Sequence, residues 1–387
     1  MQTDGFAIEE SRRANDLFAR WAVWIVVATI LAWESAGESS GRYIIYTVPP
    51  LLVIVHLALS RFRPQLDAAP LVALGLYSLA VFASLAVNPH VNAFTQRDLL
   101  IIFGYIVVFC LYLKAPAAIA DVLLVGLSLG LLIEARREGV TLDISFAGSQ
   151  GIVESVLAFP LGALLIYYLS QRRWGRALLT GLVFLVAFKR IALIGVGAAV
   201  ALDFLTRHLS VVARRRMFIA VVIFGCLFAL FSVRVFDELA TLLGSDSSNA
   251  ISLGRYQIAT ELWTKFSQGG GLHWLFGYGP GAADTWVAQM DQVDELRNPH
   301  NDWLKILVDY GAFGLILWNG ILARFFPANR LGNQLYLYAG VLMITDNTLI
   351  YLFHFAVAFL ISRIEPSPQV EPLIRSQQAA AYDRQTA

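Results

Sequence analysis

A short polar stretch, RNPHNDWL at residues 297–304, holds the residue types that acid–base chemistry needs. It places His300 directly before Asn301 and Asp302, at the start of an apolar run. Histidine titrates near neutral pH, so it can take a proton from a hydroxyl group without help from another residue. Pro299 suits the turn before a helix, and Asn301 or Asp302 can cap the helix that follows. The stretch predicts a histidine base at a helix N-terminus, although His300 could instead only cap the helix or bind water.

Lysine and arginine residues in three other places could bind an anion. Lys189 and Arg190 form a short turn between two apolar segments. Arg255 follows a glycine at the start of an amphipathic stretch, and Arg97 begins another apolar segment. Arginine offers phosphate oxygens a planar fork of donors that stays charged. The alternative for each residue is a membrane anchor or a solvated loop position, and for Arg97 the anchor is the stronger interpretation.

Two acidic residues could support such a site. Glu154 lies near the end of an apolar segment, where pairing with an arginine is a better expectation than acid catalysis. Asp309 follows Asp302 by two helical turns. It could orient His300 or a neighbouring arginine, or it could form an ion pair with Lys305, four residues before it.

The composition is that of an all-α integral membrane protein. Hydrophobic residues make up 57% of the 387 residues, charged residues only 15%, and the mean hydropathy is +0.63. These apolar segments have the length of helices rather than of barrel strands. The net charge of +1 provides no basic face for nucleic acid. Cys110 and Cys226 lie inside apolar runs, so we expect neither a disulfide nor a metal site from them.

Apolar segments divide the chain into membrane and loop regions. We predict about twelve transmembrane helices, some of them shorter than the roughly 20 residues of a full span. They lie near 17–33, 43–60, 69–87, 98–113, 117–133, 151–169, 176–188, 191–206, 217–235, 304–324, 333–345 and 347–363. The predicted regions are a cytoplasmic segment (1–16), nine helices (17–235), one large extracytoplasmic loop with short helices (236–303), three helices (304–363) and a disordered cytoplasmic tail (364–387).

The distribution of positive charge predicts the orientation. With a cytoplasmic N-terminus, 18 of the 29 lysine and arginine residues fall on the cytoplasmic side, including every dense cluster. His300, Arg190, Arg255 and Arg97 are then all extracytoplasmic. A positive charge kept on that side against the general bias is a candidate for holding an anion.

The large loop has two further patterns. Residues 255–266 repeat apolar side chains with helical spacing, which predicts an amphipathic helix at the membrane interface. The sequence GYGPG at 277–281 predicts a turn whose backbone angles favour glycine.

Together these motifs resemble the O-antigen ligase and O-antigen polymerase family of bacterial envelope glycosyltransferases. The resemblance rests on the Gly-Arg at the start of the loop, the glycine-rich turn, the lysine–arginine turn, and PHNxxLxxLxxxGxxG from Pro299 to Gly314. It covers about residues 140–325. Where the family often has Ser-Arg, this chain has Lys189-Arg190, which keeps the arginine.

The resemblance implies a multi-pass protein of the bacterial inner membrane with a periplasmic active site, acting in lipopolysaccharide or polysaccharide biosynthesis. The donor would be a glycan on undecaprenyl diphosphate, and the acceptor a hydroxyl of lipid A core or of another glycan. His300 would be the base, and Arg190 and Arg255 would hold the diphosphate, with Lys189 and Arg97 as further candidates. Asn301, Asp302, Asp309 and Glu154 would support the site. Transfer would invert the anomeric centre, and neither a metal nor another cofactor is expected.

Several alternatives stay open at this point. A ligase-like role is favoured slightly over a polymerase or a protein O-oligosaccharyltransferase, which carry the same motifs. A transporter for lipid-linked glycans is the rival from another class. It predicts charges deep in the helices on both sides of the membrane, whereas the candidates here gather on one side.

Overall fold

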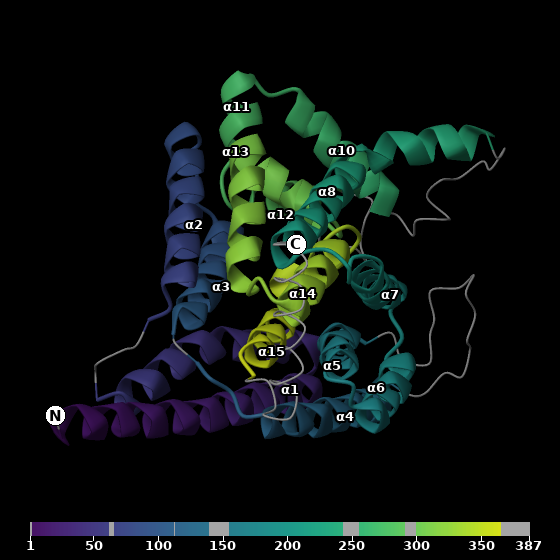
Figure 1. Ribbon diagram of the computed structural model, residues 1–387. Coiled ribbons are helices and arrows are strands. Elements are labelled where there is room, and N and C mark those ends of the chain that lie inside the picture. Colours follow the sequence, from purple (N-terminus) through teal and green to yellow (C-terminus); the bar gives the residue numbers. More distant parts are fainter. Residues whose placement is uncertain are drawn as a thin grey trace, which may run out of the picture.

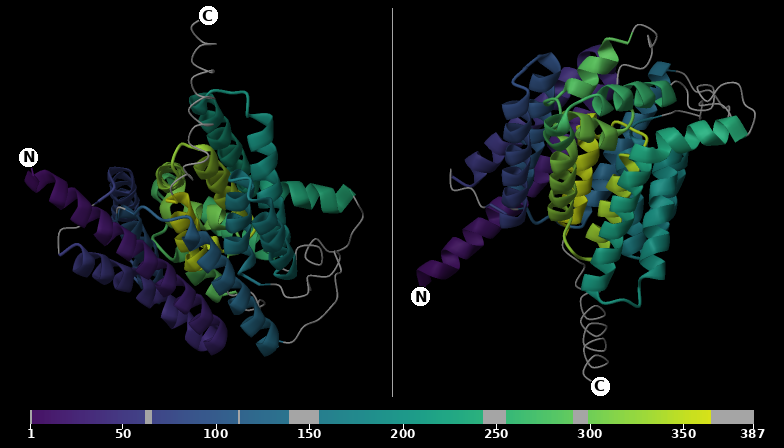
Figure 2. Two further views of the ribbon diagram at one scale, coloured as in Figure 1. Left: turned by 60° about the horizontal axis from the view of Figure 1, so that its bottom comes forward. Right: turned by 90° about the horizontal axis from the view of Figure 1, so that it is seen from above.

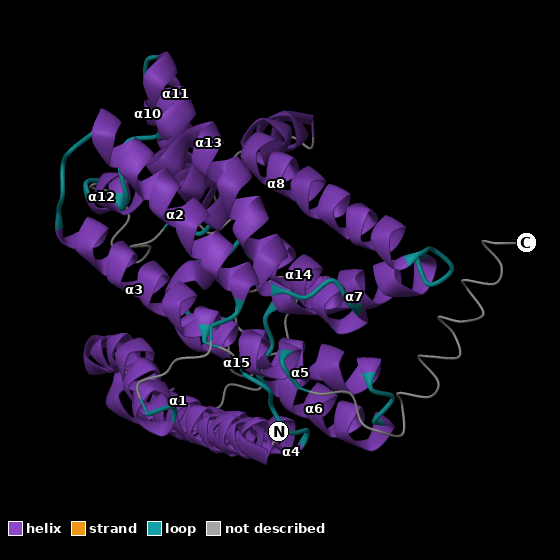
Figure 3. Ribbon diagram, turned by 60° about the vertical axis from the view of Figure 1, so that its left-hand side comes forward, coloured by secondary structure: helices purple, strands orange, loops and turns teal. Residues whose placement is uncertain are grey.

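The fold is a bundle of helices, seen in a computed structural model of the chain (Figure 1). The structure describes residues 2–61, 66–111, 113–138, 155–242, 255–290 and 299–364. Within these ranges there is no β-strand, only two isolated bridges, and Figure 3 accordingly shows helices joined by loops. The predicted all-helical class is therefore confirmed.

Fourteen α-helices and one 3-10 helix make up the described part of the chain. In chain order they are α1 (Gln2–Leu59), α2 (Ala68–Val87), α3 (Ala93–Cys110), α4 (Ala118–Glu138), α5 (Ala158–Ser170), α6 (Trp174–Val186), α7 (Arg190–Leu205), α8 (Val211–Leu242), α10 (Arg255–Ser267), α11 (Gly271–Phe276), α12 (Ala282–Ala288), α13 (Asp302–Phe325), α14 (Arg330–Leu342), η1 (Thr348–Ile350) and α15 (Leu352–Ser362).

Five stretches of helix are long and apolar enough to cross a membrane, judged by length and composition: Ala14–Ala36, Ala68–Val87, Ala93–Cys110, Ala118–Arg137 and Asp302–Phe325. Each of the twelve predicted segments overlaps a helix, but the count of twelve transmembrane helices is not confirmed. Three short helices, α10, α11 and α12, lie in the predicted large loop. Residues 243–254 and 291–298 of that loop lie outside the described residues.

Helix α1 contains both of the first two predicted segments and folds back on itself. The rings of Phe18 and His56 meet edge to face with 4.7 Å between their centroids. In a straight helix, 38 residues would separate them by about 57 Å. Figure 2 shows the two arms of α1 running side by side. Pro49 and Pro50 lie inside the second arm, which packs with the first against α3, α4 and α15.

Helix α13 is the element that connects the loop helices to the membrane helices. It packs along α2 on one side and against α11 and α12 on another. Its helical course is broken at Gly311, where φ is 67° and ψ is −170°. Tyr310, just before the break, shares a 3.0 Å hydrogen bond with the hydroxyl group of Tyr77 in α2.

Two glycines allow the chain after α11 to approach this break. Gly277 and Gly311 both have positive φ, with ψ near −170° in each, a region open to little but glycine. A Cβ atom on Gly277 would overlap the backbone of Asp309, and one on Gly311 would overlap the backbone of Leu275. The amide of Tyr278 then donates to the carbonyl of Val308 over 2.9 Å. The predicted glycine turn is thus confirmed, and it allows the backbone of this segment to contact the backbone of α13 directly.

We predict that Gly311→Ala destabilises the protein by at least about 1–3 kcal/mol, because the residue would combine backbone strain with overlap against Leu275. The matched control is Gly75→Ala in the middle of α2, where nothing lies within 4 Å of the new methyl group. That change should be neutral or stabilise by about 0.5–1 kcal/mol. Thermal unfolding in detergent measures both, and equal midpoints for the two variants would contradict this role of Gly311.

Candidate functional site

The N-terminus of α13 holds the predicted base. Asn301, one of the two residues predicted to cap the helix, is the N-cap, and its side-chain oxygen accepts the amide of Leu304 over 3.0 Å. His300 precedes it with φ of 50°, a left-handed conformation that is uncommon outside glycine but that histidine adopts more often than most residues. The side chain of His300 is partly exposed, whereas Pro299 and Asn301 on either side are buried. The backbone around His300 is therefore held by buried neighbours, while its imidazole ring is partly exposed.

Asn347, from the turn after α14, contacts His300 at two points. The backbone amide of His300 donates to Oδ1 of Asn347 over 2.8 Å. Because that amide needs an oxygen, the NH₂ group of Asn347 faces the ring, 3.4 Å from Nδ1. An NH₂ group only donates, so a hydrogen bond at this contact requires the tautomer with its lone pair on Nδ1 and its proton on Nε2.

Asp346 extends this contact to the lysine–arginine turn. Its Oδ1 accepts the amide of Asn347 over 2.9 Å, and its Oδ2 lies 3.0 Å from Nζ of Lys189. Nζ also lies 5.1 Å from the centre of the Phe159 ring, which adds a cation–π contact. Two residues that are 111 positions apart, Lys189 and His300, are therefore joined through Asp346 and Asn347.

Arg190 follows Lys189 as the first residue of α7. Its side chain is exposed and makes no ion pair or hydrogen bond with any described residue. The two residues of the turn thus differ in availability: Lys189 is held by Asp346, and Arg190 is open to a ligand.

Asp302 holds the turn after α14 in place through hydrogen bonds of its carboxylate and its backbone amide. Its Oδ2 accepts the hydroxyl of Thr348 over 2.7 Å and the amide of Leu349 over 3.0 Å, and its own amide donates to the carbonyl of Met343. Asp302 and Thr348 are both fully buried. Asp302 therefore supports the site by holding the segment that carries Asp346 and Asn347.

The segment 345–349 was not among the residues predicted for the site. The sequence TDNT at 345–348 does interrupt two apolar segments, and this polar interruption was the available signal. Four polar residues between helices fit an ordinary connecting turn equally well. Only the pairing of α13 with this turn, far apart in the chain, gives Asp346 and Asn347 their place beside His300 and Lys189.

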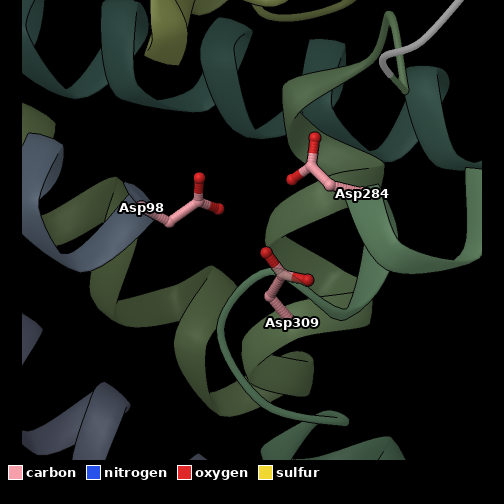
Figure 4. Close-up of side chains that lie close together, drawn as sticks. All are labelled: Asp98, Asp284 and Asp309. Atoms are coloured by element: carbon pink, nitrogen blue, oxygen red, sulfur yellow. The ribbon is translucent and has the colours of Figure 1, made fainter. Parts of the chain in front are cut away.

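A buried charge cluster lies further along α13. We define the Lys305 cluster as Lys305, Arg97, Asp98, Asp284 and Asp309. Nζ of Lys305 lies 2.5 Å from Asp98 and 2.9 Å from Asp309, and it also pairs with Asp284. Figure 4 shows the three carboxylates, from α3, α12 and α13, facing one another. Their oxygens lie within 4.8 Å of one another, which is close enough to hold a metal ion, but the ammonium of Lys305 sits among them. The cluster therefore carries its own cation.

Arg97 is the second cation of the Lys305 cluster. Its guanidinium lies 2.8 Å from Asp98 and 2.9 Å from Asp284. Burial alone would raise the pKa of Asp284, but Lys305 and Arg97 together hold that pKa below its ordinary value. Asp284 stays charged at neutral pH, and its contribution to stability is lost only as the pH falls through this lowered pKa. Arg97 thus forms ion pairs with two carboxylates that lie on α3 and α12, a structural role that the sequence did not indicate.

Asp309 connects this cluster to the glycine turn. Besides Lys305, its carboxylate accepts the amides of Gly281, over 3.2 Å, and Ala283, over 2.9 Å. Of the two roles considered for Asp309, the ion pair with Lys305 is the one present, and its described partners do not include His300. Asp309 therefore holds α12 and the turn before it against α13.

Two predicted site residues lack a side-chain description. Arg255 is the first residue of α10, and the structure does not describe its side chain. Glu154 lies outside the described residues. The amphipathic helix predicted after Arg255 is present as α10, with Ile258, Leu262 and Phe266 fully buried.

We predict that Lys305→Met destabilises the protein by about 3–5 kcal/mol, because it leaves three buried carboxylates without their central cation. Adding Asp98→Asn to that variant should restore part of the loss by removing one of the charges. Lys265→Met is the control, since Lys265 lies on α10 with its Nζ 6.0 Å from the Trp286 ring and outside the cluster. A melting midpoint for Lys305→Met equal to that of the control would contradict the assignment.

Comparison with known proteins bears on the second half of the chain. A family model described as O-Antigen ligase matches residues 175–319, from α6 into α13. The match contains Lys189, Arg190, Arg255, His300 and Lys305, and it ends before Asp346. No curated protein matches the sequence of this chain. Residues 175–319 therefore match the O-antigen ligase family, and the family resemblance predicted from the sequence is confirmed over this range.

Proposed function

We propose that the protein is a membrane glycosyltransferase that moves a glycan from an undecaprenyl-diphosphate carrier to a sugar hydroxyl. In the ligase-like form of this proposal, the hydroxyl belongs to lipid A core. The site faces the periplasm, and the protein resides in the inner membrane. The family domain supports the general class of reaction, and the site residues support the more specific steps.

The observation that carries the proposal is the connection from Lys189 through Asp346 and Asn347 to His300. A transfer from a diphosphate needs a base for the incoming hydroxyl and a cation for the leaving group, close together. The connection fixes the lysine–arginine turn relative to the histidine. Arg190, exposed at the N-terminus of α7, also has the positive end of the helix dipole beside it, which favours an anion there.

The reaction follows from these groups. The acceptor oxygen bonds to the anomeric carbon as the bond from that carbon to the diphosphate oxygen breaks, and the configuration inverts. The hydroxyl proton passes to Nδ1 of His300, so the acceptor approaches the ring from the side of Asn347 and displaces the 3.4 Å contact. The negative charge that develops on the diphosphate is stabilised by Arg190 and, from α10, by Arg255. Lys189 and Arg97 have internal carboxylate partners, and in this proposal they position the site rather than bind phosphate.

The same groups would serve a polymerase, whose acceptor is a second lipid-linked glycan. They would serve a protein O-oligosaccharyltransferase equally well. A transporter is less well supported, because the charges of the Lys305 cluster pair with one another instead of lining a path.

Reconstitution with defined substrates tests the function. The purified protein in vesicles is given an undecaprenyl-diphosphate glycan together with either lipid A core or a second lipid-linked glycan. We expect a product only with lipid A core, one glycan larger than the acceptor. Products of stepwise increasing length with the second acceptor would identify a polymerase, and no product with either acceptor would contradict the glycosyltransferase proposal.

We predict that Arg190→Lys lowers transfer by about tenfold or more, because one charge-assisted hydrogen bond of about 1.5–3 kcal/mol is lost when a point charge replaces the fork. The control is Arg207→Lys, just beyond the other end of the same helix, where the guanidinium lies 4.4 Å from the Phe204 ring. The loss should appear in the dependence of the rate on donor concentration. Wild-type transfer by Arg190→Lys would remove Arg190 from the diphosphate site.

A further inference from the structure

Helix α11 presents an apolar surface that the described part of the protein covers only in part, where Trp274 packs on Phe266 of α10 with 4.8 Å between ring centroids. Leu272 is 63% exposed, Leu275 is 46% exposed and Trp274 is 38% exposed. The six residues of α11 include no lysine, arginine, aspartate or glutamate. Its one histidine, His273, stacks on Tyr278 with 4.3 Å between ring centroids. We call Leu272, Trp274 and Leu275 the α11 surface.

The neighbouring helix α10 shows the opposite pattern. Its exposed and half-buried positions include Gln257, Thr264, Lys265 and Ser267, and its apolar side chains face inward. A polar outer surface suits a helix that faces water. The amphipathic helix predicted from the sequence is therefore present as α10, but its apolar side packs on the protein and not on the membrane interface. The α11 surface departs from this pattern within a few residues, which points to an apolar environment instead of water.

The α11 surface continues into the lipid-facing side of the membrane helices. Phe276 at the end of α11 packs on Phe313 of α13, with 5.7 Å between ring centroids. Ile316, one turn further along the same face of α13, is 71% exposed in a helix that is long and apolar enough to span a membrane. Helix α11 also packs beside α2, where Phe82 is 70% exposed.

The contacts with α2 indicate where α11 lies relative to the end of a candidate membrane span. Ser84 lies in the last turn of α2, and its hydroxyl donates to the carbonyl of Asp309 over 2.6 Å. Gly311, which follows Asp309 by two residues, meets the backbone of Leu275. The C-terminal end of α11 therefore lies near the last turn of α2, at the end of that candidate membrane span. Tryptophan prefers this boundary between lipid headgroups and acyl chains.

We propose that the α11 surface inserts into the outer leaflet of the membrane, where its partner is the upper part of the lipid acyl chains. The large loop then does not lie wholly in water. Its helix α11 enters the lipid interface beside α13, while α10 stays in water. Insertion would hold the glycine turn, and with it α12, against α13 at a fixed depth.

Site-directed fluorescence tests this placement without reference to activity. The two native cysteines, Cys110 and Cys226, are buried and are first replaced by alanine. Single cysteines are then introduced by Leu272→Cys and Leu275→Cys, labelled with an environment-sensitive fluorophore, and the protein is reconstituted in phosphatidylcholine–phosphatidylglycerol vesicles. In one series of measurements the vesicles contain lipids with a nitroxide near the top of the acyl chain. In another series, iodide is present on both sides of the vesicle membrane.

Two further positions calibrate the readings. Phe82→Cys on α2 reports the lipid environment, and Thr264→Cys on the exposed side of α10 reports water. We expect both α11 labels to be quenched by the lipid nitroxide, like Phe82→Cys, and to be at least threefold less sensitive to iodide than Thr264→Cys. Iodide quenching of both α11 labels equal to that of Thr264→Cys, with no effect of the nitroxide, would overturn the proposal. Circular dichroism of each labelled variant confirms that the helices remain.

Discussion

The ammonium of Lys305, enclosed by three carboxylates, is the interaction on which the outer half of the molecule depends. It joins α3, α12 and α13 at one buried point, and Arg97 closes the cluster from the α3 side. A buried carboxylate without a partner is costly, so these helices cannot separate without exposing unpaired charges. Asp309 extends the constraint by binding the amides of Gly281 and Ala283. The loop helices are thereby fixed on α13, the helix whose N-terminus carries His300.

A second constraint joins the two sequence regions of the site. The turn after α14 is held by Asp302 and presents Asp346 to Lys189 and Asn347 to His300. One polar turn thus sets the relation between a candidate base and a candidate phosphate-binding arginine that lie on different helices. The two residues of the lysine–arginine turn have different roles. The ammonium of Lys189 pairs with Asp346, whereas Arg190, whose planar guanidinium suits phosphate oxygens, remains exposed.

Features that depend on local sequence could be predicted. The Asn301 cap, the amphipathic helix after Arg255 and the glycine turn all follow from residues within a few positions of one another. The family resemblance also followed from motif residues. Features that depend on tertiary pairing could not be predicted. Arg97 looked like an anchor or a ligand, because its partners Asp98 and Asp284 come together only when α12 packs on α3.

The same limit applies to the membrane helices and to the missed residues. Apolar runs located the helices, but hydropathy cannot tell a full span from a short buried helix, so the number of spans did not follow. It also could not reveal that Gly311 breaks α13 so that α11 can reach it. Asp346 and Asn347 had no motif to mark them, since their role comes from contacts across more than 40 residues.

The measurement that tests the account most directly is the rate of glycan transfer by His300→Ala, with binding of the undecaprenyl-diphosphate donor measured in the same vesicles. If His300 takes the proton of the acceptor hydroxyl and the arginines hold the diphosphate, transfer falls by at least about 100-fold while donor affinity remains within about threefold of wild type. Transfer near the wild-type rate by a correctly folded His300→Ala protein would contradict the account.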